Sequence, residues 1–310
     1  ILRVEMNGKG ALPERMREPI DAARDQGYLV PFYYTVPDGH NPAGFSFSQR
    51  RREQIIEVLR QEGVLVLEDA PYLYINYAAP ADRAQTFLSI DSKQTIHLFT
   101  GSKIGFPGPR VGYLYSDATI QIEGGEDVPL STLALTESSA DVLFQNPAAL
   151  RGFEALMHKR EDNGCYTKRD SMWPLAENKL GVYRENRQIL LDTVEAELPD
   201  YKEHFEWTVP DGGFFSVFTF KRVAGTPVIQ TDDALIEQLV KEHGIVVIPM
   251  YDFYPADARQ RDPGAGMNQL RLSFCFSESQ GDARRADMRE AVVAFCAAAK
   301  RLVGVVGDAS

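Results

Sequence analysis

The fold is indicated by the stretch VLVLEDAPY at residues 64–72, where four apolar residues run without interruption into two acidic ones. A short, continuously apolar run of this kind is typical of a strand buried on both faces, as in a parallel sheet. The acidic residues and the turn formers after them then stand at the carboxyl end of the strand. Ligands of open α/β sheets bind outside that end, so a functional site is expected there.

Strand and helix signals alternate on both sides of this stretch. A strand is expected over 29–36, and a helix is expected from a cap at Ser48 to Gln61, because its apolar residues recur with helical spacing. Further strands are expected over 96–99 and 111–115. This order of elements predicts an α/β architecture for the first half of the chain.

The second half of the chain predicts a smaller α+β unit. Its expected elements are a helix over 183–198, a strand over 214–220, a helix over 232–243, strands over 246–249 and 270–276, and a helix over 282–303. We therefore expect a large domain over 1–182 and a small C-terminal domain with its linking helix over 183–310. Residues 130–156 are expected to be helical, and the polar segment 159–178 is expected to be a loop or an excursion of the chain.

The composition excludes several classes of protein. Forty-four acidic residues against 33 basic ones give a net charge of −11 over 310 residues, which argues against sequence-independent nucleic-acid binding and against an anionic membrane surface as a partner. No apolar run reaches the length of a membrane-spanning helix. Three widely spaced cysteines predict neither a disulfide framework nor a zinc site, and they favour a reducing compartment such as the cytoplasm.

Five polar motifs follow one another at expected strand ends or within an expected strand. They are NPAG at 41–44, EDAPY at 68–72, TGSK at 100–103, PGPRVG at 107–112 and NQLRLSF at 268–274. Taken singly, each motif has a structural explanation as a turn, a helix cap or a polar surface.

In this order and spacing the five motifs resemble those of the class I and II aminotransferases, which are fold-type-I enzymes dependent on pyridoxal 5′-phosphate (PLP). The resemblance covers about residues 1–303, and the loops are similar to those of the aromatic/2-aminoadipate (kynurenine-type) and valine–pyruvate branches. It implies a mostly parallel, doubly wound sheet with a smaller C-terminal α+β domain, and a homodimer. It also implies that the N-terminal part of the large domain is missing from this chain.

The resemblance assigns roles around the cofactor. Lys103 would form the Schiff base with the cofactor aldehyde and, once displaced, would move a proton at the substrate α-carbon. Asp69 would keep the pyridine nitrogen protonated, which lets the ring accept electrons. Asn41 and Tyr72 would donate hydrogen bonds to the phenolic oxygen of the ring.

The resemblance also assigns residues to the two anionic groups of the site. Thr100, Ser102 and Arg110 match the positions that bind the cofactor phosphate, and two hydroxyls with a guanidinium suit a dianion. Arg271 would bind the α-carboxylate of the substrate, beside Asn41. No metal is implied.

The function implied is a PLP-dependent aminotransferase that moves an amino group from an L-amino acid to a 2-oxo acid by a ping-pong mechanism. Two alternatives stay open. One is other PLP-dependent carbanion chemistry of a biosynthetic pathway, as in a lyase, decarboxylase or cyclase. The other is the PLP-sensing domain of a transcriptional regulator.

Three further segments carry expectations. The aromatic run at 32–34 has two explanations, as a lining of the cofactor ring pocket or as part of the core, and the core is expected because aromatic residues in strands usually belong to it. The arginine run at 50–52 is expected to be a solvated helix start. GGFF at 212–215 resembles a family segment whose backbone passes close to the substrate, with an ordinary turn into a strand as the alternative.

Overall fold

A computed structural model describes most of the chain, over residues 1–105, 107–122, 124–142 and 146–304. The chain divides into two compact units. The N-terminal unit comprises residues 2–38 and 46–178, and the C-terminal unit comprises residue 1, residues 39–45 and the chain from residue 179 onward. Among the described residues, no helix is both long enough and apolar enough to cross a membrane.

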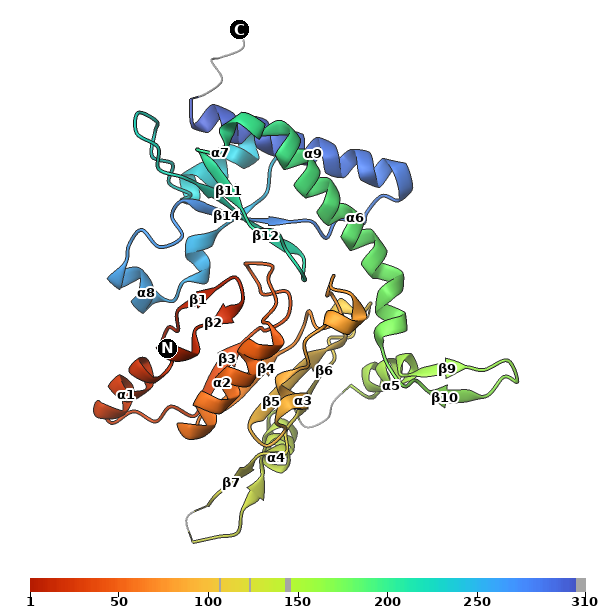
Figure 1. Cartoon of the computed structure of the whole chain (residues 1–310). Coiled ribbons are helices and arrows are strands. Elements are labelled where there is room, and N and C mark those ends of the chain that lie inside the picture. Colours follow the sequence, from red (N-terminus) through yellow and green to blue (C-terminus); the bar gives the residue numbers. More distant parts are fainter. Residues whose placement is uncertain (106, 123, 143–145, 305–310) are drawn as a thin grey trace. The chain divides into compact units, whose positions relative to one another are not determined.

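The N-terminal unit is built on a four-stranded sheet with the order β3-β4-β5-β6 (Figure 1). The first three strands are parallel, and β6 pairs antiparallel with β5. The strands and helices of this unit are β1 (Met6–Asn7), β2 (Gly10–Ala11), η1 (Pro13–Arg15), α1 (Arg17–Asp25), β3 (Phe32–Thr35), α2 (Gln49–Gln61), β4 (Leu65–Asp69), η2 (Pro80–Asp82), α3 (Phe87–Ile90), β5 (Thr95–Thr100), η3 (Gly101–Lys103), β6 (Gly112–Tyr115), β7 (Thr119–Ile120), β8 (Val128–Pro129), α4 (Leu130–Val142), α5 (Pro147–Leu156), β9 (His158–Arg160) and β10 (Tyr166–Lys168). The expected α/β order is confirmed.

Helix α2 begins and packs as its sequence predicts. The side chain of Ser48 caps it by accepting a hydrogen bond from the backbone N–H of Arg51, at 3.3 Å. Ile55 and Ile56 are buried, and the helix packs against β4. A glycine, Gly63, follows the helix in the left-handed conformation that ends many helices.

The two faces of this sheet differ in exposure. On one face Val66 and Glu68 are fully buried, close to α2 and α3. On the other face Phe32, Tyr34 and Leu114 are 46%, 54% and 41% exposed. The expectation that the aromatic run at 32–34 belongs to the core is therefore wrong for Phe32 and Tyr34, because alternate residues of a strand point to opposite faces and only one face here is well covered.

The arginine run at 50–52 also differs from expectation at one position. Arg52 is fully buried, because the helical turn directs it inward. Its guanidinium donates to both carboxylate oxygens of Asp38, at 2.7 and 3.2 Å, and to the backbone oxygens of Pro37 and Phe47. A pattern of charge alone could not separate this residue from exposed Arg50 and half-buried Arg51.

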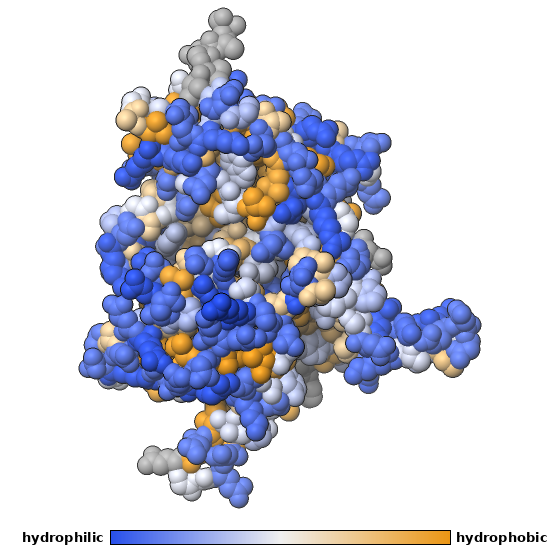
Figure 2. Space-filling model, in the orientation of Figure 1, coloured by the Kyte–Doolittle hydropathy of each residue, from blue (hydrophilic) through white to orange (hydrophobic). Residues whose placement is uncertain are grey.

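The segment between the two halves of the chain is more ordered than its polarity indicates. The helix expected over 130–156 is instead two helices, α4 and α5. Of the loop or excursion expected over 159–178, the loop is wrong, because the chain forms the antiparallel hairpin β9–β10 and then begins α6 (Trp173–Glu197). The hairpin is exposed and largely hydrophilic, and that polarity hides its strands (Figure 2).

The C-terminal unit has a four-stranded antiparallel sheet with the order β11-β12-β14-β13. Phe205, Phe218, Phe220 and Phe295 form much of its buried core. The strands and helices after α6 are η4 (Pro199–Tyr201), β11 (Phe205–Trp207), β12 (Phe215–Phe220), α7 (Asp233–His243), β13 (Ile248–Pro249), η5 (Met250–Phe253), α8 (Ala256–Arg261), β14 (Gln269–Ser273) and α9 (Gly281–Leu302). The smaller α+β unit is therefore present.

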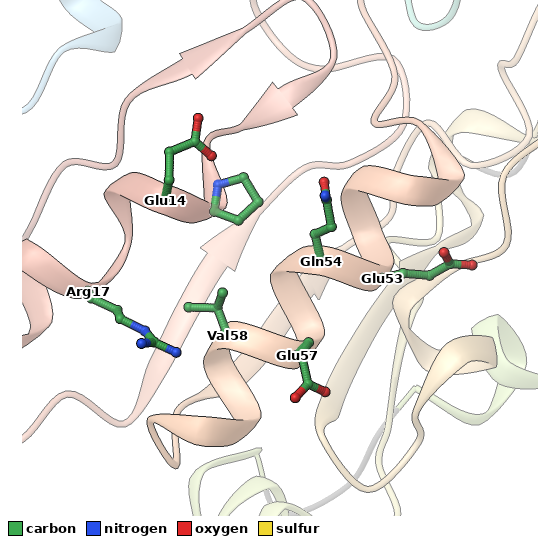
Figure 3. Close-up of a pocket in the computed structure, with 7 residues that line it drawn as sticks. Glu14, Arg17, Glu53, Gln54, Glu57 and Val58 are labelled. Carbon is green, nitrogen blue, oxygen red and sulfur yellow. The ribbon is translucent and has the colours of Figure 1, made fainter.

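An open groove of about 710 Å³ lies between η1, α1 and α2 in the N-terminal unit (Figure 3). Its lining includes three glutamates, Glu14, Glu53 and Glu57, and one cation, Arg17. No residue of the five sequence motifs lines it. The groove is therefore separate from the candidate site.

Candidate active site

The carboxyl end of the parallel sheet gathers predicted site residues of the N-terminal unit. Asp69 is the last residue of β4, and Thr100 is the last residue of the neighbouring β5. Parallel strands end at the same edge, so both side chains belong to one edge of the sheet. A pocket of about 350 Å³ at this edge is lined by Asp69, Leu98, Phe99, Thr100, Gly112, Tyr113 and Leu114.

Two tyrosines and a lysine lie near the carboxyl end of β4. The hydroxyl of Tyr34 donates a hydrogen bond of 2.8 Å to Oδ2 of Asp69. Tyr72 follows β4 by three residues and is buried, with 6% of its surface exposed. The Nζ atom of Lys103 lies 5.8 Å from the centre of the Tyr72 ring. The amine that the motifs predicted thus lies beside the predicted phenol, and the predicted carboxylate precedes that phenol closely in the chain.

A hydroxyl pair and a guanidinium form a second cluster at the start of η3. The Thr100 hydroxyl donates to the Ser102 hydroxyl at 3.0 Å, and a guanidinium nitrogen of Arg110 donates to the same oxygen at 3.3 Å. Arg110 has a φ of 57°, a left-handed conformation that is uncommon outside glycine. Such strained backbone occurs preferentially at functional positions. The cluster presents the donor set that a phosphate dianion requires.

A buried ionic network supports the strand that carries Asp69. Glu68 is fully buried and accepts hydrogen bonds from the backbone N–H groups of Phe87 and Leu88 at the start of α3. Oε2 of Glu68 also lies 2.7 Å from Nδ1 of His97 on β5, and Arg52 lies 3.9 Å from Oε1. The network therefore fixes β4 and β5 just behind the candidate site.

Asp38 completes this network at the end of the loop after β3. Burial raises the pKa of the Asp38 carboxyl, while the paired guanidinium of Arg52 opposes that shift. A buried pair of this kind with two hydrogen bonds constrains both residues. The backbone that leads into residues 39–45 is anchored at this point.

The C-terminal unit holds the remaining two predicted residues in direct contact. A guanidinium nitrogen of Arg271, on β14, donates to the side-chain oxygen of Asn41 at 2.8 Å. The guanidinium carbon of Arg271 lies 4.1 Å from the centre of the Phe215 ring and 5.0 Å from that of Phe253. Flanking rings of this kind favour a cation and restrict its movement. A guanidinium so held suits a carboxylate ligand.

Close backbone packing holds Asn41 in this unit. Gly39 and Gly213 both have positive φ values, of 51° and 67°. A Cβ atom at Gly39 would lie 2.2 Å from the backbone nitrogen of Gly213, so neither position has room for a side chain. The GGFF segment is therefore a turn into β12 whose backbone passes close to the Asn41 loop.

The predicted residues thus fall into two groups. Asp69, Tyr72, Thr100, Ser102, Lys103 and Arg110 lie at one edge of the N-terminal sheet, and Asn41 and Arg271 lie together in the C-terminal unit. Sequence analysis assigned Phe253 no site role of its own, and it favoured a place in the core for Tyr34 over a place in the ring pocket. The expected alternation of side chains along β3 could have placed Tyr34 on the face of Asp69, whereas none of the five motifs placed the ring of Phe253 beside Arg271.

The described residues contain no group of three or more His, Cys, Asp or Glu side chains that could hold a metal ion. Cys165 and Cys275 are exposed thiols, and Cys296 is a buried one. Burial raises the pKa of the Cys296 thiol to about 12, so this side chain is protonated and inert.

The family model for class I and II aminotransferases matches residues 37–282, which include all eight predicted site residues. The chain belongs to this family. Its members use PLP as their cofactor.

Individual relatives are distant and longer than this chain. The (S)-3,5-dihydroxyphenylglycine transaminase of Amycolatopsis orientalis is 29% identical over 274 residues, covering 87% of this chain and 55% of the relative. The mitochondrial kynurenine/alpha-aminoadipate aminotransferase of Mus musculus is 25% identical over 261 residues, covering 82% of this chain and 55% of the relative. The chain therefore spans about half the length of these relatives.

Solved structures show the same fold. The aromatic aminotransferase Aro9 of Candida albicans superposes with a TM-score of 0.73 at 18% identity, covering 97% of this chain and 63% of that one. The kynurenine aminotransferase of Pyrococcus horikoshii, solved with pyridoxamine phosphate (PMP), has a TM-score of 0.70 at 21% identity over 97% of this chain and 63% of that one.

The residues present fit a pyridoxal phosphate. The cofactor offers an aldehyde, a pyridine nitrogen, a phenolic oxygen and a phosphate. The sheet edge offers an amine on Lys103, a carboxylate on Asp69 and a phenol on Tyr72, together with the cluster formed by Thr100, Ser102 and Arg110. The sheet edge thus carries a side chain of suitable chemistry for each of these groups of the cofactor.

Proposed function

We propose that this protein is a PLP-dependent aminotransferase of fold type I that moves an amino group from an L-amino acid to a 2-oxo acid. The observation that carries the proposal is the grouping of Asp69, Tyr72 and Lys103 with the Thr100–Ser102–Arg110 cluster at one sheet edge. A family member that had lost catalysis would be free to lose any of these side chains.

Each residue has a definite task in this proposal. Lys103 would bind the cofactor aldehyde and, once released from it, would move a proton at the substrate α-carbon. The carboxylate of Asp69 would hold the proton on the pyridine nitrogen, and Tyr72 and Asn41 would donate to the phenolic oxygen. PLP, when bound, supplies the electron-accepting ring that makes the α-proton removable.

The charged groups at the ends of the two ligands have their own partners. Thr100, Ser102 and Arg110 bind the phosphate through two hydroxyls and a guanidinium. Arg271 binds the α-carboxylate of the substrate, and its hydrogen bond to Asn41 orients the guanidinium for that contact. An α-carboxylate is common to all amino acids. This contact therefore selects amino acids as a class and does not select among their side chains.

We further propose an aromatic or 2-aminoadipate-type amino acid as the donor. The support is the activity of the relatives, which include aromatic and kynurenine/alpha-aminoadipate aminotransferases. We also propose a doubly wound large domain, a homodimer and a cytoplasmic location. Size-exclusion chromatography with light scattering tests the dimer.

Absorption spectroscopy of the purified protein with added PLP tests the cofactor assignment. We expect a visible band that is lost in Lys103→Ala and kept in Lys93→Ala, which removes an exposed lysine of the same unit. A band that survives in Lys103→Ala would show that another amine holds the cofactor.

The reaction itself is tested by adding a panel of amino acids. Transamination predicts conversion of the band to that of the pyridoxamine form and release of the matching 2-oxo acid. Loss of carbon dioxide, or a cyclic or eliminated product, would instead support the lyase, decarboxylase or cyclase alternative.

A further inference from the structure

Asp69 has a partner that none of the five motifs contains. Tyr34 lies on β3, the strand next to β4, and the parallel register pairs Tyr34 with Leu67. Alternate residues of a strand share a face, so Tyr34 and Asp69 lie on the same face of the sheet, one residue pair apart. The long phenol spans this diagonal, and its hydroxyl lies 2.8 Å from Oδ2 of Asp69.

We propose that Tyr34 is a positioning residue for Asp69 in the transamination reaction, an inference that rests on the proposed function. The phenol donates to one carboxylate oxygen and so fixes the rotation of the carboxylate. The second oxygen, Oδ1, would then be the one available to the pyridine nitrogen of PLP. Tyr34 would touch neither the substrate nor the reacting atoms.

The electrostatics of the pair favour this role. A hydrogen bond donated to a carboxylate stabilises its charged form, which is the form that keeps the pyridine nitrogen protonated. Burial, together with the hydrogen bond and the charge of Asp69, raises the pKa of the Tyr34 phenol. The phenol therefore stays protonated at physiological pH and remains a donor.

Packing alone does not account for this tyrosine. Its side chain lies on the less covered face of the sheet, with 54% of its surface exposed. The hydroxyl, which is the part that a phenylalanine lacks, makes the specific contact. Tyr34→Phe therefore removes the proposed function of the residue and leaves its ring in place.

Tyr115 provides a matched control in the same sheet. It lies on β6, is 52% exposed, and its hydroxyl donates to Oδ1 of Asp117 at 3.0 Å. Tyr115→Phe therefore deletes a phenol–carboxylate bond of the same kind from a similarly exposed tyrosine. Asp117 belongs to none of the five motifs.

The first experiment titrates PLP into the wild type, Tyr34→Phe and Tyr115→Phe and then measures kcat and KM for the best amino donor. A hydrogen bond to a charged group predicts an increase of about tenfold in the PLP dissociation constant for Tyr34→Phe. It also predicts a lower kcat with little change in KM, since the lost contact lies on the cofactor side. Tyr115→Phe is expected to match the wild type in all three quantities.

Two results would overturn the inference while the proposed function stands. If Tyr34→Phe binds PLP and turns over like the wild type, the phenol has no positioning role. If Tyr34→Phe binds PLP more tightly, the phenol competes with the cofactor for Asp69. If the wild type itself shows no Lys103-dependent band, the proposed function fails and the role of Tyr34 in it fails as well.

A second experiment tests the contact without cofactor. The urea midpoints of Tyr34→Phe, Asp69→Asn and the double variant form a thermodynamic cycle in the cofactor-free protein. We expect the effect of Tyr34→Phe to become smaller when Asp69 is already Asn, because the charged acceptor is gone. Strictly additive effects would overturn the contact, whatever the outcome of the PLP titration.

Discussion

At the scale of single residues, His40 is the side chain whose surroundings the sequence indicated least. It stands in a loop of turn formers beside Asn41, yet its ring stacks on that of Phe45 with centroids 5.2 Å apart. Its Nδ1 atom is buried and has no hydrogen-bond partner among the described residues. Burial of this kind lowers the pKa of His40 to about 4.

The lowered pKa of His40 predicts a loss of stability in mild acid. The unfolded chain takes up the proton at its ordinary pKa of 6.5, while the folded chain resists protonation down to about 4. The unfolded state binds more protons in this window, so the free energy of unfolding falls as the pH falls, by about 2 kcal/mol at pH 5. Urea unfolding at pH 7 and pH 5 measures this loss.

The variant His40→Gln isolates the effect from other titrating groups. It cannot take up a proton, so its free energy of unfolding should fall less than that of the wild type between pH 7 and pH 5. Asp38 also has a shifted pKa, but that carboxyl is common to both proteins and cancels in the comparison. An unchanged pH dependence in His40→Gln would assign the acid sensitivity to another group.

The candidate site residues could be named at this scale, because five motifs in order carry more information than any one of them, and their roles stay predictions. Residues whose roles depend on where the side chain points could not be named from the sequence. Arg52 shares its charge with its neighbours, and only the helical turn directs it to Asp38. Tyr34 shares its aromatic character with Tyr33, and only the strand alternation brings it to Asp69.

At the scale of elements, the sequence predicted the helices and strands whose capping and buried residues lie within one segment. The Ser48 cap, the apolar strand β4 and the helix α7 all follow such signals. The hairpin β9–β10 escaped prediction, because its strands are three residues long and exposed. Short polar strands have no alternation for a sequence pattern to detect.

The turn into β12 makes a prediction about packing between loops. Gly213→Ala would place a Cβ atom 2.5 Å from the carbonyl oxygen of Gly39, at a φ of 67°. Gly225→Ala is the matched control, since its φ is 86° and nothing lies within 4 Å. Gly225→Ala should lower the free energy of unfolding by about 1–2 kcal/mol, because of its backbone conformation alone. Gly213→Ala should lower the free energy of unfolding by about 1–3 kcal/mol more, because the loops that carry Gly39 and Gly213 must separate.

Urea unfolding of both variants measures the difference. Since the Gly39 loop carries Asn41, Gly213→Ala should also raise the KM for the amino donor, and Gly225→Ala should not. Equal losses of stability in the two variants would show that the two loops separate without a further loss of stability. Their contact would then not stabilise the fold.

At the scale of the whole molecule, the division into two units was only partly visible in the sequence. A change from α/β to α+β patterning indicated two parts, and the structure has two. The membership of residues 39–45 in the C-terminal unit has no sequence signal, because it depends on the contact between Gly39 and Gly213, far apart in the chain. The boundary expected at 182/183 stays a prediction.

The two tryptophans of the chain make the two units separately observable, because each unit contains one of them. Trp173 packs in the N-terminal unit, 3.6 Å from the guanidinium carbon of Arg83. Trp207 packs on Phe218 in the C-terminal unit, with ring centroids 6.4 Å apart. The variants Trp207→Phe and Trp173→Phe each leave one fluorescent reporter.

We predict that Arg52→Met destabilises the N-terminal unit by about 3–5 kcal/mol, because it leaves the buried Asp38 carboxylate without its partner. The urea midpoint reported by Trp173 should fall further than that reported by Trp207, since chains of several compact units need not unfold in one step. Arg60→Met is the control, because its pairs with Glu57 and Asp91 are half-exposed and worth less than about 1 kcal/mol. If Arg52→Met lowers the urea midpoints reported by both tryptophans equally, the two units unfold together. The Arg52 network would then contribute to the stability of the whole chain.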